Sequence, residues 1–331
     1  MKVGKVTGNA LKRSVLKQIV PTEYRKEIIR GAAIGADCAL FACPQDAKAA
    51  VCVEEAAVAG KADMELLAGR CANNIAAGGA KPVAALIGLI LPESVEEPEL
   101  KTLMVAAKEA CEAYGMQIAG GHTTVSHAVS CPIVALTVWG RLTHDQENNR
   151  SLCKAAPGQD IVISKWIGLE GTALLAAKHE ERLKQRYPVS LVEEAAGFGK
   201  YMSVLPEAQI ALEHGVCAMH DASEGGILAA LWELAEGAGT GLTVDMKKLP
   251  IRQETVEVCE CIGANPYELR SGGCLIMTSR DGQSLAEALQ KAQIPAVVAG
   301  KLTEGRERLI TNEDEVRYMD RPQVDEIYKF L

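Results

Sequence analysis

The segment from residue 216 to residue 236 constrains the fold more than any other part of the chain. An apolar strand-like run, Val216 to Met219, leads into a helix-like run, Ile227 to Glu236, through the acidic glycine turn His220-Asp221-Ala222-Ser223-Glu224-Gly225-Gly226. A strand that passes directly into a helix is typical of a layered α/β domain. A carboxylate at such a point can bind Mg²⁺, and the N–H groups at a helix start can bind an anion. The turn therefore predicts a site for a metal-bound phosphate group.

A second glycine pair follows the predicted strand Met116 to Ala119. Gly120 and Gly121 precede His122, Thr123 and Thr124, in a similar strand-to-loop setting. Two such turns in one chain indicate a nucleotide site. Each turn taken singly is equally typical of a loop that needs positive φ angles.

An amphipathic helix is predicted after the apolar strand Ala49 to Val53. Asp63 is placed to cap it, and it runs to about Gly78. The helical spacing of Met64, Leu67, Cys71 and Ile75 predicts one buried face, with Asn74 at its edge. A polar amide there is either hydrogen-bonded within the core or a ligand to something bound.

The same alternation continues along the chain and predicts an α/β architecture in both halves. Polar residues 143 to 150, followed by Pro157-Gly158, mark the best domain boundary. We expect one domain over residues 1–150 and a second over 151–331. The remaining predicted strands and helices are Val83–Leu91, Glu99–Tyr114, Ile133–Gly140, Asp160–Ser164, a helix opened by Gly168 and ending at Lys184, Val189–Tyr201, Pro206–His214, Leu242–Asp245, Gln253–Cys261, Gly273–Thr278, Ser284–Ala292 and Ala296–Gly300, with a short strand and a charged tail after Glu304.

Composition and charge limit the classes of protein to which the chain can belong. With 331 residues, 48% hydrophobic and 24% charged, it has room for two globular domains. A net charge of −8 without a Lys/Arg-rich run argues against nucleic acid as a partner. The first twenty residues contain no continuous apolar core, so we expect neither a secretory signal nor a membrane span, and a cytoplasmic location.

The 11 cysteines suggest reduced core residues, because most lie in apolar runs and no Cys-x-x-Cys pair occurs. For the closely spaced Cys259 and Cys261, the sequence leaves open whether they are reduced core residues.

An ordered set of motifs resembles the aminoimidazole ribonucleotide (AIR) synthetase superfamily over nearly the whole chain. The motifs are Gly35-Ala36-Asp37-Cys38-Ala39, Asn73 to Pro82, Gly120 to Thr123, His220 to Gly226 and Ser271-Gly272-Gly273. This superfamily includes thiamine-monophosphate kinase, selenophosphate synthetase and the hydrogenase-maturation carbamoyl dehydratases called HypE. The chain is most similar to the AIR synthase-related, HypE-like members, through Lys165 to Thr172 and Met219 to Gly226.

The resemblance implies an N-terminal α/β domain that dimerises through its sheet, a C-terminal α/β domain, and ATP bound with Mg²⁺ in a cleft. It implies that Asp37, Asn74 and Asp221 bind the metal. The nucleotide-binding positions would be Gly120, Gly121, Thr123, Gly225 and Gly226. His122 and His220 are the candidates for acid–base catalysis, with a hydrogen-bonded turn residue as the alternative for each.

This chain departs from the superfamily pattern at several positions. Asn74 stands where aspartate is usual, and His122 stands where HypE has aspartate. Glu54 or Glu55, expected at the end of a strand, would either compensate for the lost charge or simply be solvated. The last cysteine is Cys274, so we expect no acceptor thiol at the C-terminus of the kind that HypE uses.

Three hypotheses follow. The first is an ATP- and Mg²⁺-dependent homodimeric enzyme that phosphorylates or activates an oxygen of its acceptor, which is either a small molecule or a carbamoyl- or amide-type group. The second is a nucleotide-binding maturation partner without turnover. The third is a thiamine-monophosphate-kinase-like enzyme, against which the sparse aspartate set argues.

Overall fold

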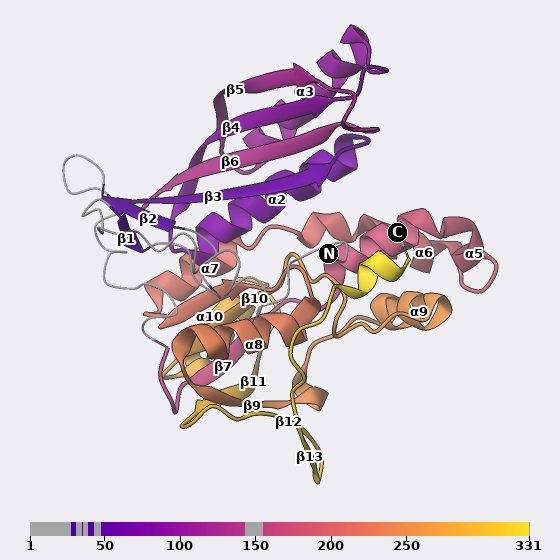
Figure 1. The fold of residues 1–331 in the computed structure, drawn as a ribbon. Coiled ribbons are helices and arrows are strands. Elements are labelled where there is room, and N and C mark those ends of the chain that lie inside the picture. The colour runs from indigo at the N-terminus through magenta and orange to yellow at the C-terminus, as the bar shows by residue number, and fades with distance from the viewer. Residues whose placement is uncertain (1–27, 31–34, 36–38, 43–47, 143–154, 331) are drawn as a thin grey trace. The chain divides into compact units, whose positions relative to one another are not determined.

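The computed structural model describes residues 28–30, 35, 39–42, 48–142 and 155–330, and the chain divides into two compact units. The N-terminal unit comprises Arg25–Gly31 and Asp37–Glu147, and the C-terminal unit contains Asn148–Leu331. Each unit has its own sheet with helices packed on it, as predicted for an α/β chain (Figure 1). The boundary predicted at 150/151 lies outside the described residues and stays a prediction.

The N-terminal unit is built on a six-stranded sheet. Only the β4–β5 pair is parallel, and the other neighbours are antiparallel. The strands lie in the order β1 (Ile28–Arg30), β2 (Ala39–Ala42), β3 (Lys48–Ala57), β6 (Ile133–Arg141), β4 (Lys81–Leu91) and β5 (Gln117–Val125). Helices α2 (Lys61–Ala77) and α3 (Glu97–Ala113) pack against each other, and α2 covers one face of β3, β6 and β4.

The predicted apolar face of α2 is confirmed. Met64, Leu67, Cys71 and Ile75 are all fully buried. Asp63 caps α2 as predicted, but from within its first turn, because α2 begins after Gly60. Its Oδ2 reaches back to accept the N–H groups of Ala59 and Gly60, so the carboxylate still caps the helix.

The second predicted glycine turn is not a turn. Gly120 to Thr124 lie within strand β5, where Gly120 pairs with Leu86 of β4 and His122 pairs with Gly88. A Cβ added at Gly121 would lie 1.9 Å from the carbonyl oxygen of Ile87. The glycine here serves the close approach of two strands, a role that the sequence pattern does not distinguish from a turn.

The C-terminal unit is built on a seven-stranded sheet in which only β9 and β12 are parallel. The strand order is β13 (Glu315–Tyr318), β12 (Arg308–Asn312), β9 (Gly241–Asp245), β11 (Ala296–Thr303), β7 (Asp160–Ser164), β10 (Leu275–Ser279) and β8 (Ala218–Asp221). Helix α8 (Gly226–Ala238) places Ile227, Leu231 and Leu234 in one buried cluster with the sheet residues Ile161, Ile163 and Ile276. Helices α7 (Leu205–Glu213) and α10 (Gly282–Lys291) contact β10, and α10 also contacts β7 and β11.

A separate helical layer joins α4 (Leu169–Lys178), α5 (Glu180–Lys184), α6 (Val189–Ala196) and α9 (Gln253–Ile262). The single helix predicted up to Lys184 is broken at His179, and the helix predicted up to Tyr201 ends as the 3-10 helix η4 (Gly197–Tyr201). Two short 3-10 helices, η5 (Met246–Lys248) and η6 (Glu326–Lys329), complete the unit.

Most cysteines in the part of the chain that is described are core residues, whereas Cys131 and Cys217 are half-buried. All eight cysteines in this part of the chain are free thiols, and Cys259 and Cys261 are buried in the helical layer. Burial raises the pKa of the Cys259 thiol to about 12, so this thiol stays protonated at neutral pH. Within the same ranges, no helix combines the length and apolar character needed to cross a membrane.

We expect Gly140→Ala to destabilise the N-terminal unit. The added Cβ would lie 2.3 Å from Cγ2 of Ile75, so α2 and β6 would have to separate. Overpacking of this kind costs about 1–3 kcal/mol. Gly88→Ala is the matched control, because its Cβ would lie at an ordinary 3.7 Å from that of Ala135. Urea unfolding of both variants measures the difference, and equal midpoints would contradict the account.

Candidate functional site

The acidic glycine turn begins inside the sheet of the C-terminal unit. β8 covers Ala218–Asp221, two residues later than predicted, because His220 pairs with Ile276 and Asp221 with Leu275 of β10. His220 is 4% exposed and Asp221 is 2% exposed. Two adjacent polar side chains so deeply buried at a strand end are costly to the fold, which marks the position as a candidate site.

The glycines of this turn are required by its backbone. Gly225 and Gly226 have φ angles of 84° and 70°, and a Cβ on Gly226 would lie 2.5 Å from the carbonyl oxygen of Tyr267. The N–H of Leu228 donates to that same carbonyl, and the N–H of Ser271 donates to the carbonyl of Ser223. The turn is thus held against the segment that leads into β10.

One N–H group of the turn is bonded to a carboxylate a hundred residues away. The Gly225 N–H donates to Oδ2 of Asp325 over 2.6 Å, while Oδ1 of Asp325 accepts the N–H of Ile327 over 2.9 Å. Asp325 is 1% exposed, and burial raises its pKa to about 6 against the opposing effect of these two N–H groups and Arg270. Sequence analysis missed this residue, because it predicted only a charged tail there. An aspartate before a helical turn is a capping signal, but nothing in the sequence names its distant partner.

Arg270 joins three segments around the turn. Its guanidinium lies 3.0 Å from Oε2 of Glu224 and 3.5 Å from Oε1 of Glu170, and it donates to the Tyr328 hydroxyl over 3.2 Å. Burial opposes its charge, but the carboxylates of Glu170 and Glu224 outweigh that effect and raise its pKa. Nothing in the sequence singles out Arg270 beyond its position next to the motif Ser271-Gly272-Gly273.

His220 has a carboxylate partner on α8. Its Nε2 lies 3.3 Å from Oε2 of Glu233, four-fifths of whose side chain is buried. A carboxylate beside Nε2 favours the proton on that nitrogen and orients the ring. The histidine therefore has the orienting contact that an acid–base residue needs.

A buried ion pair lies close to the same strand end. Nζ of Lys165 is 2.6 Å from Oε1 of Glu207 and donates to the carbonyl oxygens of Tyr201 and Ser203. Burial is the main reason that the pKa of Glu207 is raised, and it likewise raises that of the Cys274 thiol, with a smaller contribution from Asp221. Lys165 has a φ angle of 52°, a strained conformation for a side-chain-bearing residue.

The N-terminal unit places Asn74 against Glu54. Glu54 and Glu55 were expected to follow the strand. Strand β3 extends to Ala57, so both residues lie within it. The amide nitrogen of Asn74 donates to Oε1 of Glu54 over 2.9 Å, on the face of the sheet that α2 covers. Glu55 is exposed. The structure thus favours Glu54 as the acid that accompanies Asn74.

The other predicted residues of this unit are not gathered at Asn74. His122 pairs with Gly88, in register with Ala135, and lies exposed on the face opposite α2. Gly120, Gly121 and Thr123 share strand β5 with it. Asp37 lies outside the described residues.

The donor chemistry fits a magnesium ion that is completed by a ligand. No group of three or more His, Cys, Asp or Glu side chains within the described ranges could hold a metal by itself. Mg²⁺ is commonly held by one or two carboxylates together with substrate phosphates and water. In the C-terminal unit Asp221 offers oxygen ligands of this kind. In the N-terminal unit, taken by itself, Glu54 and Asn74 do so.

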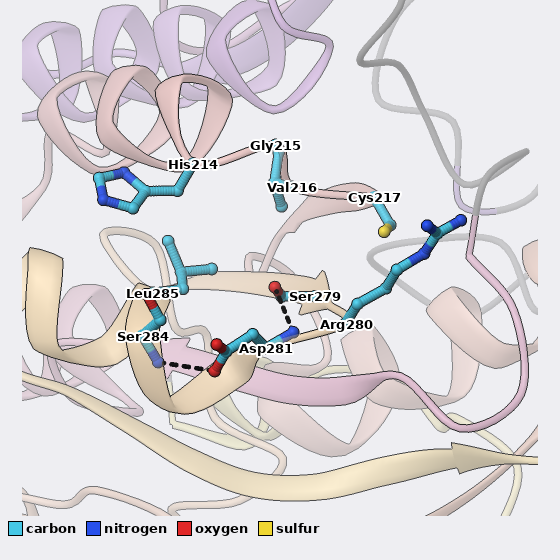
Figure 2. A pocket seen from close by; sticks show the side chains of 9 residues that line it. All are labelled: His214, Gly215, Val216, Cys217, Ser279, Arg280, Asp281, Ser284 and Leu285. Carbon is cyan, nitrogen blue, oxygen red and sulfur yellow. Dashed lines mark hydrogen bonds between the residues drawn. The ribbon is translucent and has the colours of Figure 1, made fainter.

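A depression of about 400 Å³ lies at the other end of β8 (Figure 2). His214, Cys217, Ser279, Arg280 and Asp281 contribute polar groups to it. Asp281 Oδ1 accepts the Ser284 N–H, and the Asp281 N–H donates to the Ser279 hydroxyl, so these groups mainly stabilise the start of α10. Thr278 precedes Ser279 of the depression and pairs with Ala218 at the start of β8. Asp221 lies at the other end of this strand. None of the sequence-predicted site residues lines this depression.

Comparison with known proteins identifies the family. The N-terminal domain of AIR synthase related proteins matches residues 35–142, and the C-terminal domain of the same proteins matches residues 156–312. The chain belongs to the AIR synthase related family. The resemblance drawn from the sequence motifs is therefore confirmed.

Among curated relatives, carbamoyl dehydratase HypE of Rhodobacter capsulatus is 29% identical over 234 residues, covering 71% of this chain and 66% of the relative. The chain thus spans just under two thirds of the length of that relative. A solved HypE–HypF complex contains a chain that superposes with a TM-score of 0.76 at 21% identity, covering 95% of this chain and 100% of that one. A HypE structure in complex with ATP gives a TM-score of 0.70 at 20% identity, covering 84% and 87%. These structures confirm the two-domain fold.

We expect Lys165→Met to be strongly destabilising, because it leaves the Glu207 carboxylate buried without its cation. Breaking such a pair costs about 3–5 kcal/mol, measured as the free energy of unfolding in urea. Adding Glu207→Gln should recover a large part of the loss. The exposed pair Lys108–Glu112 is the control, and Lys108→Met should leave stability unchanged. A Lys165→Met protein as stable as the wild type would contradict this role.

Proposed function

We propose that this protein is an ATP- and Mg²⁺-dependent enzyme that activates the oxygen of a carbamoyl- or amide-type acceptor. The observation that carries the proposal is the burial of His220 and Asp221 at the end of β8, directly before the glycine turn that opens α8. Family membership and the likeness to a HypE structure in complex with ATP support it.

The proposed roles follow from the donor atoms that each residue presents. Asp221 would hold the metal through its carboxylate oxygens. Within the N-terminal unit, Glu54 and Asn74 present oxygen donors of the same kind. His220, oriented by the Glu233 carboxylate at its Nε2, would serve as the residue that holds or transfers a proton. Bound ATP would supply the phosphoryl group that turns a poor leaving oxygen into a good one. The chain itself contributes binding, orientation and a water-poor setting.

We expect Asp221→Asn to weaken binding of Mg-ATP, because an amide carries no charge to offset the cation. A loss of about tenfold in Kd corresponds to roughly 1.4 kcal/mol and is measurable by calorimetry. His220→Gln should retain binding but lower acceptor-stimulated ADP release by roughly 100-fold. A panel of primary amides and an S-carbamoylcysteine peptide serves as the acceptor screen.

Asp314→Asn, in the exposed hairpin between β12 and β13, is the matched control for loss of one carboxylate. If wild-type protein bound no Mg-ATP, the enzyme proposal would fail. ATP binding without ADP release across the panel would favour a nucleotide-binding partner without turnover.

We also propose that the protein forms a homodimer through the sheet face opposite α2. That face exposes Val53, Leu86, Ile90 and Trp139, at 57%, 51%, 39% and 36%. Register places Val53 and Leu86 on either side of Thr137 in one row across the sheet. Such a contiguous apolar surface is typical of a protein interface, and the family resemblance favours a second copy as its partner.

We expect Leu86→Lys to convert the dimer to a monomer, because a buried ammonium in the interface would be left unpaired. Light scattering after size-exclusion chromatography gives the mass. Val105→Lys is the control, since Val105 is 49% exposed but lies on helix α3. A monomeric wild type at micromolar concentration would refute the dimer without affecting the proposed chemistry.

A further inference from the structure

The N–H of Gly225 is the donor at which the sequence predicts a phosphate, and in the structure a carboxylate of the same chain accepts it. Asp325 lies 2.6 Å from that nitrogen and is 1% exposed. Gly225 is the N-cap of α8, a 13-residue helix whose start attracts negative charge. The carboxylate therefore occupies the position that an external anion would take.

The segment that carries Asp325 is fixed to its surroundings by several contacts. The Glu326 N–H donates to the Glu268 carbonyl, and Glu326 Oε1 accepts the Asn265 N–H. Ile327 is buried in the helical layer, and the Tyr328 hydroxyl accepts from Arg270. Asp325 is thus positioned by its own segment and does not depend on Gly225 alone for its place.

The charges that face Asp325 decide how strongly it opposes an anion. Arg270 lies on one side, but this guanidinium also interacts with Glu170 and Glu224. Glu224 of the turn itself adds a like charge, and Tyr328 and Glu326 flank the site on the same segment. Arg270 is shared among several carboxylates, and Arg317 and Arg321 line the depression that contains Gly225. Asp325 is the carboxylate in direct contact with the Gly225 N–H, so a phosphate arriving at that nitrogen would meet its negative charge.

We propose that Asp325 is an internal competitor for the anion site of the glycine turn, and that it sets the affinity of this turn for phosphate groups. The inference rests on the proposed function for the identity of the ligand, a nucleotide phosphate. Asp325 accepts the N–H that the phosphate needs and repels the phosphate through its charge. The ionised Asp325 carboxylate lowers the affinity of the turn for phosphate, and removal of its charge raises that affinity.

The same competition makes anion binding depend on pH. Because the pKa of Asp325 is raised to about 6, the carboxylate is ionised at pH 8 and largely neutral at pH 5. Repulsion is therefore present above pH 6 and lost as the pH falls below it. Sulfate does not titrate between these values, so it reports on the protein alone.

The test compares wild type, Asp325→Asn and the control Asp314→Asn. Asp314 is exposed in the hairpin between β12 and β13 and does not line the depression that contains Gly225, so its variant loses one charge away from the turn. Calorimetry with Mg-ATP at pH 8 should show roughly fivefold or tighter binding for Asp325→Asn and no change for Asp314→Asn. Thermal unfolding verifies that each variant is folded. In wild-type protein, NMR titration with sodium sulfate should give a lower Kd at the Gly225 amide at pH 5 than at pH 8.

Equal or weaker Mg-ATP binding by a folded Asp325→Asn would overturn the inference and leave the proposed function intact. If no variant bound Mg-ATP but sulfate bound Gly225 more tightly in Asp325→Asn, the proposed function would fail and the inference would stand. Should Asp325→Asn not fold, the wild-type sulfate titration decides, and equal affinity at Gly225 at both pH values would refute the competition.

Discussion

The arrangement of the C-terminal unit depends on one buried cation, Arg270. Its guanidinium links Glu170 at the start of α4, Glu224 in the acidic glycine turn and Tyr328 near the end of the described chain. A buried charge is tolerated only where partners surround it, so these three segments are held together by the need to satisfy one group. The turn that leads from Asp221 into α8 takes its shape within this network.

The network explains why so many charged groups can be buried around one strand end. Lys165 and Glu207 form a second closed pair, and His220 is matched by Glu233. Burying any one of these charged groups alone would destabilise the fold, and its partner offsets that cost. A fold that keeps such pairs so near a glycine-rich helix start has the preorganised polar groups that binding and proton transfer require.

Much of the fold could be predicted because it follows from local patterns. The face of α2 follows from the helical spacing of Met64, Leu67, Cys71 and Ile75, and β7 was predicted with its observed bounds. The strand character of Gly120 to Thr124 could not be predicted, since it depends on pairing with residues of β4 that lie 34 positions earlier in the chain. Asp325 and Arg270 escaped prediction for the same reason: their partners lie far away in sequence, and only the folded chain brings them together. The role of Asp221 at the site stays a prediction, as does that of Asp37.

In the function that we propose, the turn between β8 and α8 binds the phosphates of a nucleotide. Hydrogen–deuterium exchange with and without Mg-ATP tests this directly on the unmodified protein. We expect slower exchange of amides in residues 222–228 on addition of Mg-ATP. Unchanged exchange in residues 222–228, with protection confined to other segments, would contradict it.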